Sequence, residues 1–134
     1  MKRKPGSLEK PVLDGVRQVL DLYGILNFRA NTAAATITDE KSGKRRHMKM
    51  GVPGEGDIRA YPRVPRKLVC HDGAVRTVRI PFPIWIETKA PGKLNGQSDN
   101  QKAFQRYVES HGCGYLLVDD VQQVIDWLRE MRVI

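Results

Sequence analysis

The sequence predicts an α/β domain in which a mixed β-sheet is flanked by α-helices. Three segments repeat apolar residues at the spacing of an amphipathic helix, and several short segments alternate or cluster apolar residues as strands do. A strand, a helix and a strand also follow one another near the C-terminus, an order that favours a right-handed parallel crossover. The 134 residues suit one core, so we expect a single domain over 1–134, with residues 1–8 as a basic tail.

A helix is predicted at the start of the domain, followed by a half-buried strand. Apolar residues fall at helical spacing over residues 11–23. The next segment, residues 25–31, alternates in the two-residue period of a strand. Leu26, Phe28 and Ala30 are therefore expected on its buried face, and polar residues on the other face.

Two hairpins and an irregular loop are predicted in the middle of the chain. Residues 35–50 place a β-prone run and a basic run on either side of a polar turn, which predicts an exposed arm. Residues 51–57 are rich in glycine and lead into a possible strand over 57–61. Residues 67–80 predict a second hairpin, because they contain an Asp-Gly dipeptide of the kind typical of tight β-turns.

The C-terminal part is predicted to supply the crossover. Two prolines exclude a central strand before Ile84, so the core strand is expected over residues 84–89. Ser98 and Gln101 form the pattern of a helical capping box. The elements expected after the core strand are a helix over 98–112 with a buried stripe of Ala103, Phe104, Tyr107 and Val108, a buried strand over 115–120 and an amphipathic helix over 121–131.

Composition indicates a basic protein of a reducing compartment. Lys and Arg number 23 against 15 Asp and Glu, and the excess gathers in clusters that would attract polyphosphates or simply keep loops soluble. Cys70 and Cys113 lie far apart without the close ligand spacing of structural zinc sites. No apolar run approaches the roughly 20 residues of a membrane-spanning helix, and the N-terminus lacks a signal peptide's apolar stretch. We expect a cytoplasmic protein that binds no membrane.

A charged pair near the end of the core strand is the strongest functional signal. Glu87 and Lys89 project from the same face of a strand because side chains alternate. Such a pair alone is commonly a solvated strand face. Combined with Asp57 and the backbone carbonyl of Thr88, it forms a hard oxygen-rich site suited to Mg²⁺ or Mn²⁺. A lysine beside it suits phosphodiester hydrolysis, because an ammonium stabilises the charge that develops on the phosphate.

The segments "RAN", "GVPGEGD", "IETKAPG" and a following glutamine occur in that order. This series resembles the VRR-NUC (virus-type replication-repair nuclease) family, a branch of the PD-(D/E)xK nuclease superfamily, over roughly residues 8–118. The resemblance implies a restriction-endonuclease-like core and metal-dependent DNA cleavage. It departs from the family pattern at Gly56, where an apolar residue or proline usually precedes the aspartate.

The resemblance also implies roles for individual residues. Asp57, Glu87, Lys89 and Gln101 would be catalytic, and the metal would be held by Asp57, Glu87, the Thr88 carbonyl and Glu9. Gln101 could instead serve only the capping box, and Glu9 could be no more than a favourable charge at a helix N-terminus. The residues expected to bind DNA, from the resemblance and the basic clusters, are Arg29, Asn31, Lys44, Arg45, Arg46, Lys49 and Lys93; of these, Arg29 and Asn31 could also be a surface charge and a turn residue.

The expected activity is that of a structure-specific DNA endonuclease, foremost a Holliday junction (four-way junction) resolvase of a virus or phage acting in the bacterial or infected host cell. A flap endonuclease, an exonuclease, a nickase or a non-catalytic DNA-binding module are the alternatives. Symmetric cutting of two strands favours a homodimer, with the two hairpins as candidate contacts. The segment from about 62 to 83 exceeds a minimal core and is a candidate specificity arm.

Overall fold

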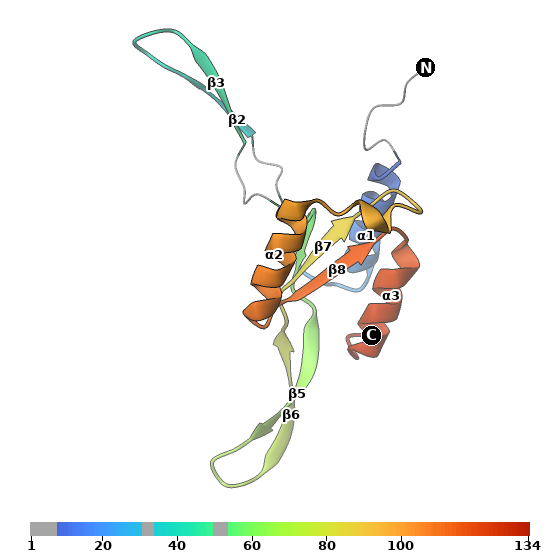
Figure 1. Ribbon diagram of the computed structural model, residues 1–134. Coiled ribbons are helices and arrows are strands. Elements are labelled where there is room, and N and C mark those ends of the chain that lie inside the picture. The colour runs from blue at the N-terminus through green and yellow to red at the C-terminus, as the bar shows by residue number, and fades with distance from the viewer. Residues whose placement is uncertain (1–7, 31–33, 50–53) are drawn as a thin grey trace.

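The computed structural model describes residues 8–30, 34–49 and 54–134, and for 34–38 and 46–49 the backbone only. A four-stranded sheet forms the centre, and two separate two-stranded hairpins extend from it (Figure 1). The helices are α1 (Lys10–Leu22), α2 (Asp99–Ser110) and α3 (Val121–Glu130), with a short 3-10 helix η1 (Leu94–Gly96). The strands are β1 (Asn27–Arg29), β2 (Ala34–Thr38), β3 (Arg45–Lys49), β4 (Ile58–Ala60), β5 (Arg63–Val69), β6 (Val75–Pro81), β7 (Ile84–Thr88) and β8 (Gly114–Val118).

The central sheet is mixed and has the strand order β1-β4-β7-β8. β4 pairs antiparallel with β1 and with β7, and Ile58 lies opposite Ile86. β7 pairs parallel with β8, and α2 connects these two strands. The predicted parallel strand-helix-strand passage and the pairing of the core strand on both sides are therefore confirmed.

Alternation along β7 gives the sheet two different faces. Ile84 and Ile86 are buried in the core that α1 and α3 form with the sheet. Trp85 faces α2, where its ring meets Phe104 edge-on at 5.6 Å between centroids. Helices thus cover both faces, α2 on one side and α1 with α3 on the other (Figure 1), as the sequence predicts.

Capping fixes where two of the helices begin. The Ser98 side chain accepts a hydrogen bond from the backbone N–H of Gln101, and the Gln101 side chain accepts one from the backbone N–H of Ser98. The predicted capping box is confirmed, and α3 begins with a second one built from Asp120 and Gln123. Each box satisfies backbone donors that the first turn of a helix leaves without a partner.

The predicted buried face of the first strand is wrong in part. Leu26 is 59% exposed and Phe28 is 46% exposed, whereas Ala30 is buried. β1 is an edge strand whose polar face turns toward α1, where Asn27 accepts a hydrogen bond from Arg17 and donates one to Asp21. Hydrogen bonds to a helix therefore hold this face, which the alternation of apolar residues alone does not predict.

Two further expectations about burial are corrected. On α2 only Phe104 and Val108 are buried, whereas Ala103 is exposed and Tyr107 is 64% exposed. β8 is an edge strand and is mostly half-buried rather than buried. Among the described helices, α2 alone packs on its face of the sheet, and Phe104 and Val108, one turn apart, are its buried contacts.

The second hairpin is longer than predicted. Its strands β5 and β6 pair over seven residues each, beginning at Arg63 rather than at residue 67 and including Pro65 and Pro81. Each strand of a two-stranded ribbon has one free edge. A proline, which lacks an N–H, can therefore occupy a position whose N–H would face away from the partner strand. The predicted turn is confirmed: Gly73 has φ +80° and the Ala74 N–H donates to the Asp72 carboxylate.

The first predicted hairpin is also present, formed by β2 and β3 in antiparallel register. Its turn is closed by the Asp39 N–H, which donates to the Lys44 carbonyl, with Gly43 at φ +66°. Figure 1 shows this hairpin extending away from the central sheet as an arm. Within the described part of the chain, every helix falls short of the length and apolarity that crossing a bilayer requires.

Candidate active site

The candidate site lies at the end of the sheet where β4 begins and β7 ends. Because these strands are antiparallel, the residue that precedes β4 meets the last residues of β7. Asp57 stands directly before β4, and Glu87 and Thr88 close β7 with Lys89 following. The structure thus brings together the residues that the sequence singles out, although they come from segments about 30 positions apart.

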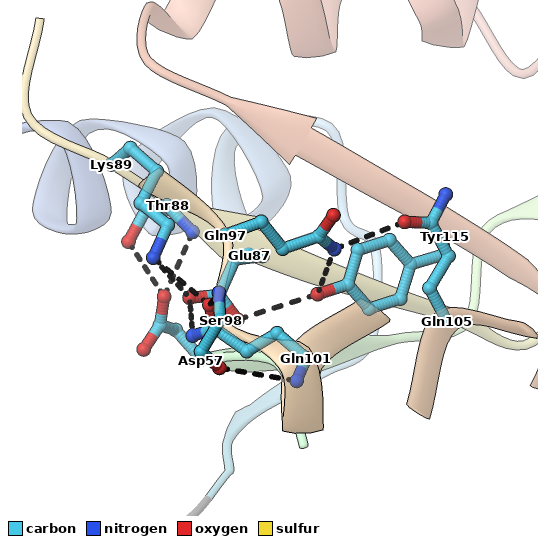
Figure 2. Close-up of polar contacts among 9 residues, drawn as sticks. All are labelled: Asp57, Glu87, Thr88, Lys89, Gln97, Ser98, Gln101, Gln105 and Tyr115. Carbon is cyan, nitrogen blue, oxygen red and sulfur yellow. Dashed lines mark hydrogen bonds and ion pairs between the residues drawn. The ribbon is translucent and has the colours of Figure 1, made fainter. Parts of the chain in front are cut away.

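Asp57 is fixed by the end of β7. One of its carboxylate oxygens, Oδ2, accepts hydrogen bonds from the Thr88 N–H at 2.8 Å and from the Thr88 hydroxyl at 3.0 Å (Figure 2). Gly56 fits closely beside β7: a Cβ there would lie 3.1 Å from the Ile86 carbonyl oxygen, so a larger residue would require a shift of a few tenths of an ångström.

Glu87 is 2% exposed and receives three donors. Gln101 Nε2 donates to its Oε1 at 2.6 Å, the Lys89 ammonium lies 3.4 Å from the same oxygen, and the Tyr115 hydroxyl lies 3.4 Å from Oε2 (Figure 2). Burial and then the neighbouring Asp57 raise the pKa of Glu87 to about 7, while Lys89 acts in the opposite direction. This carboxyl group therefore titrates near neutral pH.

Gln101 serves the helix cap and the site at once. Its Oε1 accepts from the Ser98 N–H at 2.8 Å and from the Lys89 ammonium at 3.1 Å, while its Nε2 donates to Glu87. The two interpretations of this residue are therefore compatible. Both the oxygen and the nitrogen of its side-chain amide are hydrogen-bonded, so the first turn of α2 fixes the positions of Glu87 and Lys89 relative to each other.

Glu9 completes a group of three carboxylates. It occupies the N-cap position of α1, but its side chain makes no capping hydrogen bond. Instead, single carboxylate oxygens of Glu9, Asp57 and Glu87 all lie within 4.8 Å of one another. Burial and then the neighbouring charge of Asp57 raise the pKa of Glu9, while Lys89 acts in the opposite direction.

The donor set fits a hard divalent cation. Carboxylate oxygens are the ligands that Mg²⁺ and Mn²⁺ prefer, and three of them converge here beside the ammonium of Lys89. The raised pKa values of Glu9 and Glu87 express the cost of burying these carboxylates and, second, of placing them beside Asp57. A bound cation would remove that cost, because its own charge is the largest in such a site.

Three residues around Glu87 escape prediction from the sequence. The Tyr115 hydroxyl donates to Glu87, and the Gln97 side chain lies 3.5 Å from that hydroxyl and donates to Gln105 at 3.0 Å. Burial and then Glu87 raise the pKa of Tyr115, so its hydroxyl keeps its proton as a donor. In the parallel register of β7 and β8, Tyr115 lies opposite Trp85, on the face of β7 that carries Glu87. Knowledge of this register would have allowed the contact between Tyr115 and Glu87 to be predicted.

The residues predicted to bind DNA are spread more widely. Lys93 is exposed in the loop that leads from Lys89 to α2. Arg29 is exposed at the end of β1, and the next residue, Ala30, donates its N–H to the Asp57 carbonyl. Both therefore lie on segments that flank the acidic group.

The other predicted DNA contacts belong to the β2–β3 arm or to segments outside the description. Lys44 and Arg45 are exposed at the arm's turn. Arg46 and Lys49 lie in β3, where only the backbone is described, and Asn31 lies outside the described residues.

The loop before Asp57 packs directly against α2, and this contact can be tested. Gly54 has φ +78°, and a Cβ there would lie 2.1 Å from the Asn100 carbonyl oxygen. Gly73 has nearly the same φ, +80°, with open space around it. We expect Gly73→Ala to lower the free energy of unfolding by about 1–2 kcal/mol, because alanine is strained in the left-handed backbone region. Gly54→Ala should lower it by about 1–3 kcal/mol more, because its Cβ also collides with the backbone of α2. Urea denaturation of both variants checks this, and equal losses would contradict the contact.

The geometry provides a carboxylate trio, an ammonium held beside it and an amide that orients both. These groups can hold a divalent cation and place a positive charge next to it. No family model, no curated protein and no solved structure matches the chain.

Proposed function

We propose that this protein is a Mg²⁺- or Mn²⁺-dependent DNA endonuclease that hydrolyses phosphodiester bonds, and that its substrate is a four-way DNA junction. The observation that carries the proposal is the convergence of Glu9, Asp57 and Glu87 with Lys89 at one end of the sheet. The resemblance of the sequence motifs to those of VRR-NUC nucleases also supports it, because that resemblance assigns roles to the same residues. A restriction-endonuclease-like core is part of this proposal.

The carboxylates would hold the ion. Glu9, Asp57 and Glu87 each offer one oxygen, and the Thr88 carbonyl is the proposed fourth protein ligand. When bound, the ion supplies Lewis acidity toward the scissile phosphate and the attacking water. The two hydrogen bonds from Thr88 leave the other oxygen of Asp57, Oδ1, available as a ligand.

Lys89 would act on the phosphate. Its side chain is 14% exposed, and its ammonium is held by Glu87 at 3.4 Å and by Gln101 at 3.1 Å. An ammonium positioned before the reaction stabilises charge developing on the phosphate oxygens without reorganisation. Gln101 is a positioning residue in this scheme, because it contacts both Glu87 and Lys89.

The shape of the molecule supports a branched substrate. The two hairpins extend from the sheet in different directions (Figure 1), and both carry basic residues. Contacts between such residues and phosphates position a protein without reading sequence, so recognition would depend on branch geometry. Symmetric cutting of a junction needs two active sites, so we propose a homodimer with the hairpins as candidate contacts.

A digestion assay tests the proposed function. A labelled immobile four-way junction and its component duplex are incubated with the protein in Mg²⁺, in Mn²⁺ and in EDTA. We expect the junction to be cut in either metal, the duplex to be cut much less and nothing to be cut in EDTA. Equal cutting of duplex, flap and junction would favour another nuclease of the same chemistry. Binding without cutting in both metals would favour a non-catalytic DNA-binding module.

Affinity for metal is expected to depend on pH. Because the pKa of Glu87 is raised to about 7, the ion must displace its proton below that pH. A single group of pKa 7 is about 9% ionised at pH 6 and about 91% at pH 8, so Mn²⁺ affinity should be about tenfold lower at pH 6. Isothermal titration of the protein with Mn²⁺ at both pH values measures this ratio. An unchanged affinity would contradict the displacement of a proton from Glu87 by the metal.

A further inference from the structure

A cavity lies at the end of the central sheet opposite the acidic group. It encloses about 340 Å³ at the base of the β5–β6 hairpin. Its lining residues are Tyr23, Ile25, Leu26, Tyr61, Arg63 and Arg79, with Gly24, Pro81 and Val133. Tyr61 follows β4, whereas Asp57 precedes that strand, so roughly 13 Å of extended chain separates the cavity from the acidic group.

Hydrogen bonds across the hairpin fix the positions of the two arginine side chains of this cavity. Arg63 Nη2 donates to the Arg79 carbonyl at 3.3 Å, and Arg79 Nη1 donates to the Arg63 carbonyl at 3.2 Å, a reciprocal arrangement across the hairpin. Among the described residues, neither guanidinium has a carboxylate within ion-pair distance. Each guanidinium has five N–H groups, so donors remain for an anion.

Aromatic rings stand beside these charges. Tyr23, at the end of α1, is 42% exposed, and Tyr61 meets Phe28 edge-on at 6.3 Å between centroids. Phe28 is itself 46% exposed on the edge strand β1. Tyr61 is half-buried. Accessible rings next to cationic groups are the arrangement on which unpaired bases stack while arginines contact the backbone.

The rest of the hairpin carries the same sign of charge. Residues 63–81 contain five basic residues, Arg63, Arg66, Lys67, Arg76 and Arg79, against a single acidic one, Asp72. A positively charged ribbon that leads away from an aromatic cavity complements a polyanion rather than an apolar or acidic protein segment. Charge complementarity therefore selects nucleic acid as the occupant.

From these observations we infer that the cavity at the base of the β5–β6 hairpin binds an unpaired nucleotide of single-stranded DNA. The base stacks against Tyr23 and Tyr61, and its phosphates contact Arg63 and Arg79. The interior of a duplex cannot offer the face of a base to this cavity, because each base there is stacked between two others. This site would hold an unpaired strand apart from the acidic group, and its occupation requires no cleavage.

The test measures binding of a short fluorescein-labelled oligothymidylate by fluorescence anisotropy in EDTA. Tyr23→Ala is expected to weaken binding by about tenfold, the loss of one base–ring stack, with little change in the salt dependence. Arg63→Gln and Arg79→Gln should weaken binding and reduce its salt dependence, because each removes a phosphate contact. Tyr107→Ala and Arg106→Gln, which change exposed residues on α2, are the matched controls and should bind as wild type.

Two outcomes would overturn the inference. One is an equal loss for Tyr23→Ala and Tyr107→Ala. The other is that a blunt duplex binds as tightly as the oligothymidylate and loses affinity equally in the cavity variants. Circular dichroism of each variant confirms folding, so lost binding can be assigned to the side chain. Binding is measured in EDTA, and the variants change residues outside the acidic group, so a failure of the proposed nuclease activity would leave this result standing.

Discussion

Lys89→Met is expected to lower the rate of junction cleavage by about 10²–10⁴-fold, the range measured when a catalytic proton-transfer group or a charge-stabilising donor is removed. Methionine keeps the length of the side chain and its packing but removes the ammonium that contacts Glu87 and Gln101. The carboxylates that would hold the metal remain, and the exposed basic residues that would contact DNA are unchanged. Single-turnover cleavage of the labelled junction in Mg²⁺ measures the rate.

Binding separates a chemical role of Lys89 from a structural one. The dissociation constant of the variant for the junction, measured in Ca²⁺ or EDTA, should remain within about twofold of wild type, because one phosphate contact among many contributes little. Lys102→Met, which removes an exposed lysine from α2, is the matched control and should cleave at the wild-type rate. Similar losses of cleavage in both lysine variants would exclude a specific role for Lys89.

The convergence of the site residues could be predicted from the sequence because they flank strands. Asp57 and Glu87 stand at the beginning of one strand and the end of another, so any antiparallel pairing of the two brings them together. Gln101 follows from the capping box, since the helix that it caps begins beside the end of β7. These inferences need the order of the elements and no exact register.

Features that depend on register or on tertiary partners were not predicted. Tyr115 reaches Glu87 only because β8 pairs with β7 so that Tyr115 lies opposite Trp85. The exposure of Leu26 and Phe28 follows from the position of β1 at the sheet edge, where α1 binds the polar side of the strand. Alternation along a strand identifies two faces, but the neighbouring elements decide which of them is buried.

The cavity at the base of the β5–β6 hairpin was likewise not predicted, because it depends on register and on tertiary contacts. Its lining combines the end of α1, the segment after β4 and the base of β5–β6 with Val133 near the C-terminus. Arg63 and Arg79 come together through the cross-strand register, in which Arg63 pairs with Pro81 and Pro65 with Arg79. The basic character of the segment is visible in the sequence, but its pairing with tyrosines is a property of the fold.

Glu87→Gln is expected to stabilise the metal-free protein while abolishing its activity. The folded protein holds the proton of Glu87 up to about pH 7, whereas the unfolded chain releases it near pH 4.5. The contribution of Glu87 to the free energy of unfolding is therefore greatest below pH 4.5 and declines as the pH rises through 7. A neutral amide removes this decline, so in EDTA at pH 8 the variant should gain on the order of 2 kcal/mol, and at pH 4.5 it should gain little.

The same substitution should reverse the effect of metal. Glutamine at this position can still accept the hydrogen bond from Gln101, so the first turn of α2 stays in place, but it no longer offers a negatively charged ligand. Mg²⁺ and Mn²⁺ should raise the melting temperature of the wild type, because a ligand that binds only the folded state stabilises it, and should leave the variant unchanged. Glu109→Gln, an exposed position on α2, is the control and should behave as wild type in every condition. If the variant is less stable than wild type at pH 8 in EDTA, the Glu87 carboxylate stabilises the folded protein. If the variant is more stable but does not cleave, the Glu87 carboxylate lowers the stability of the fold and is required for the chemistry.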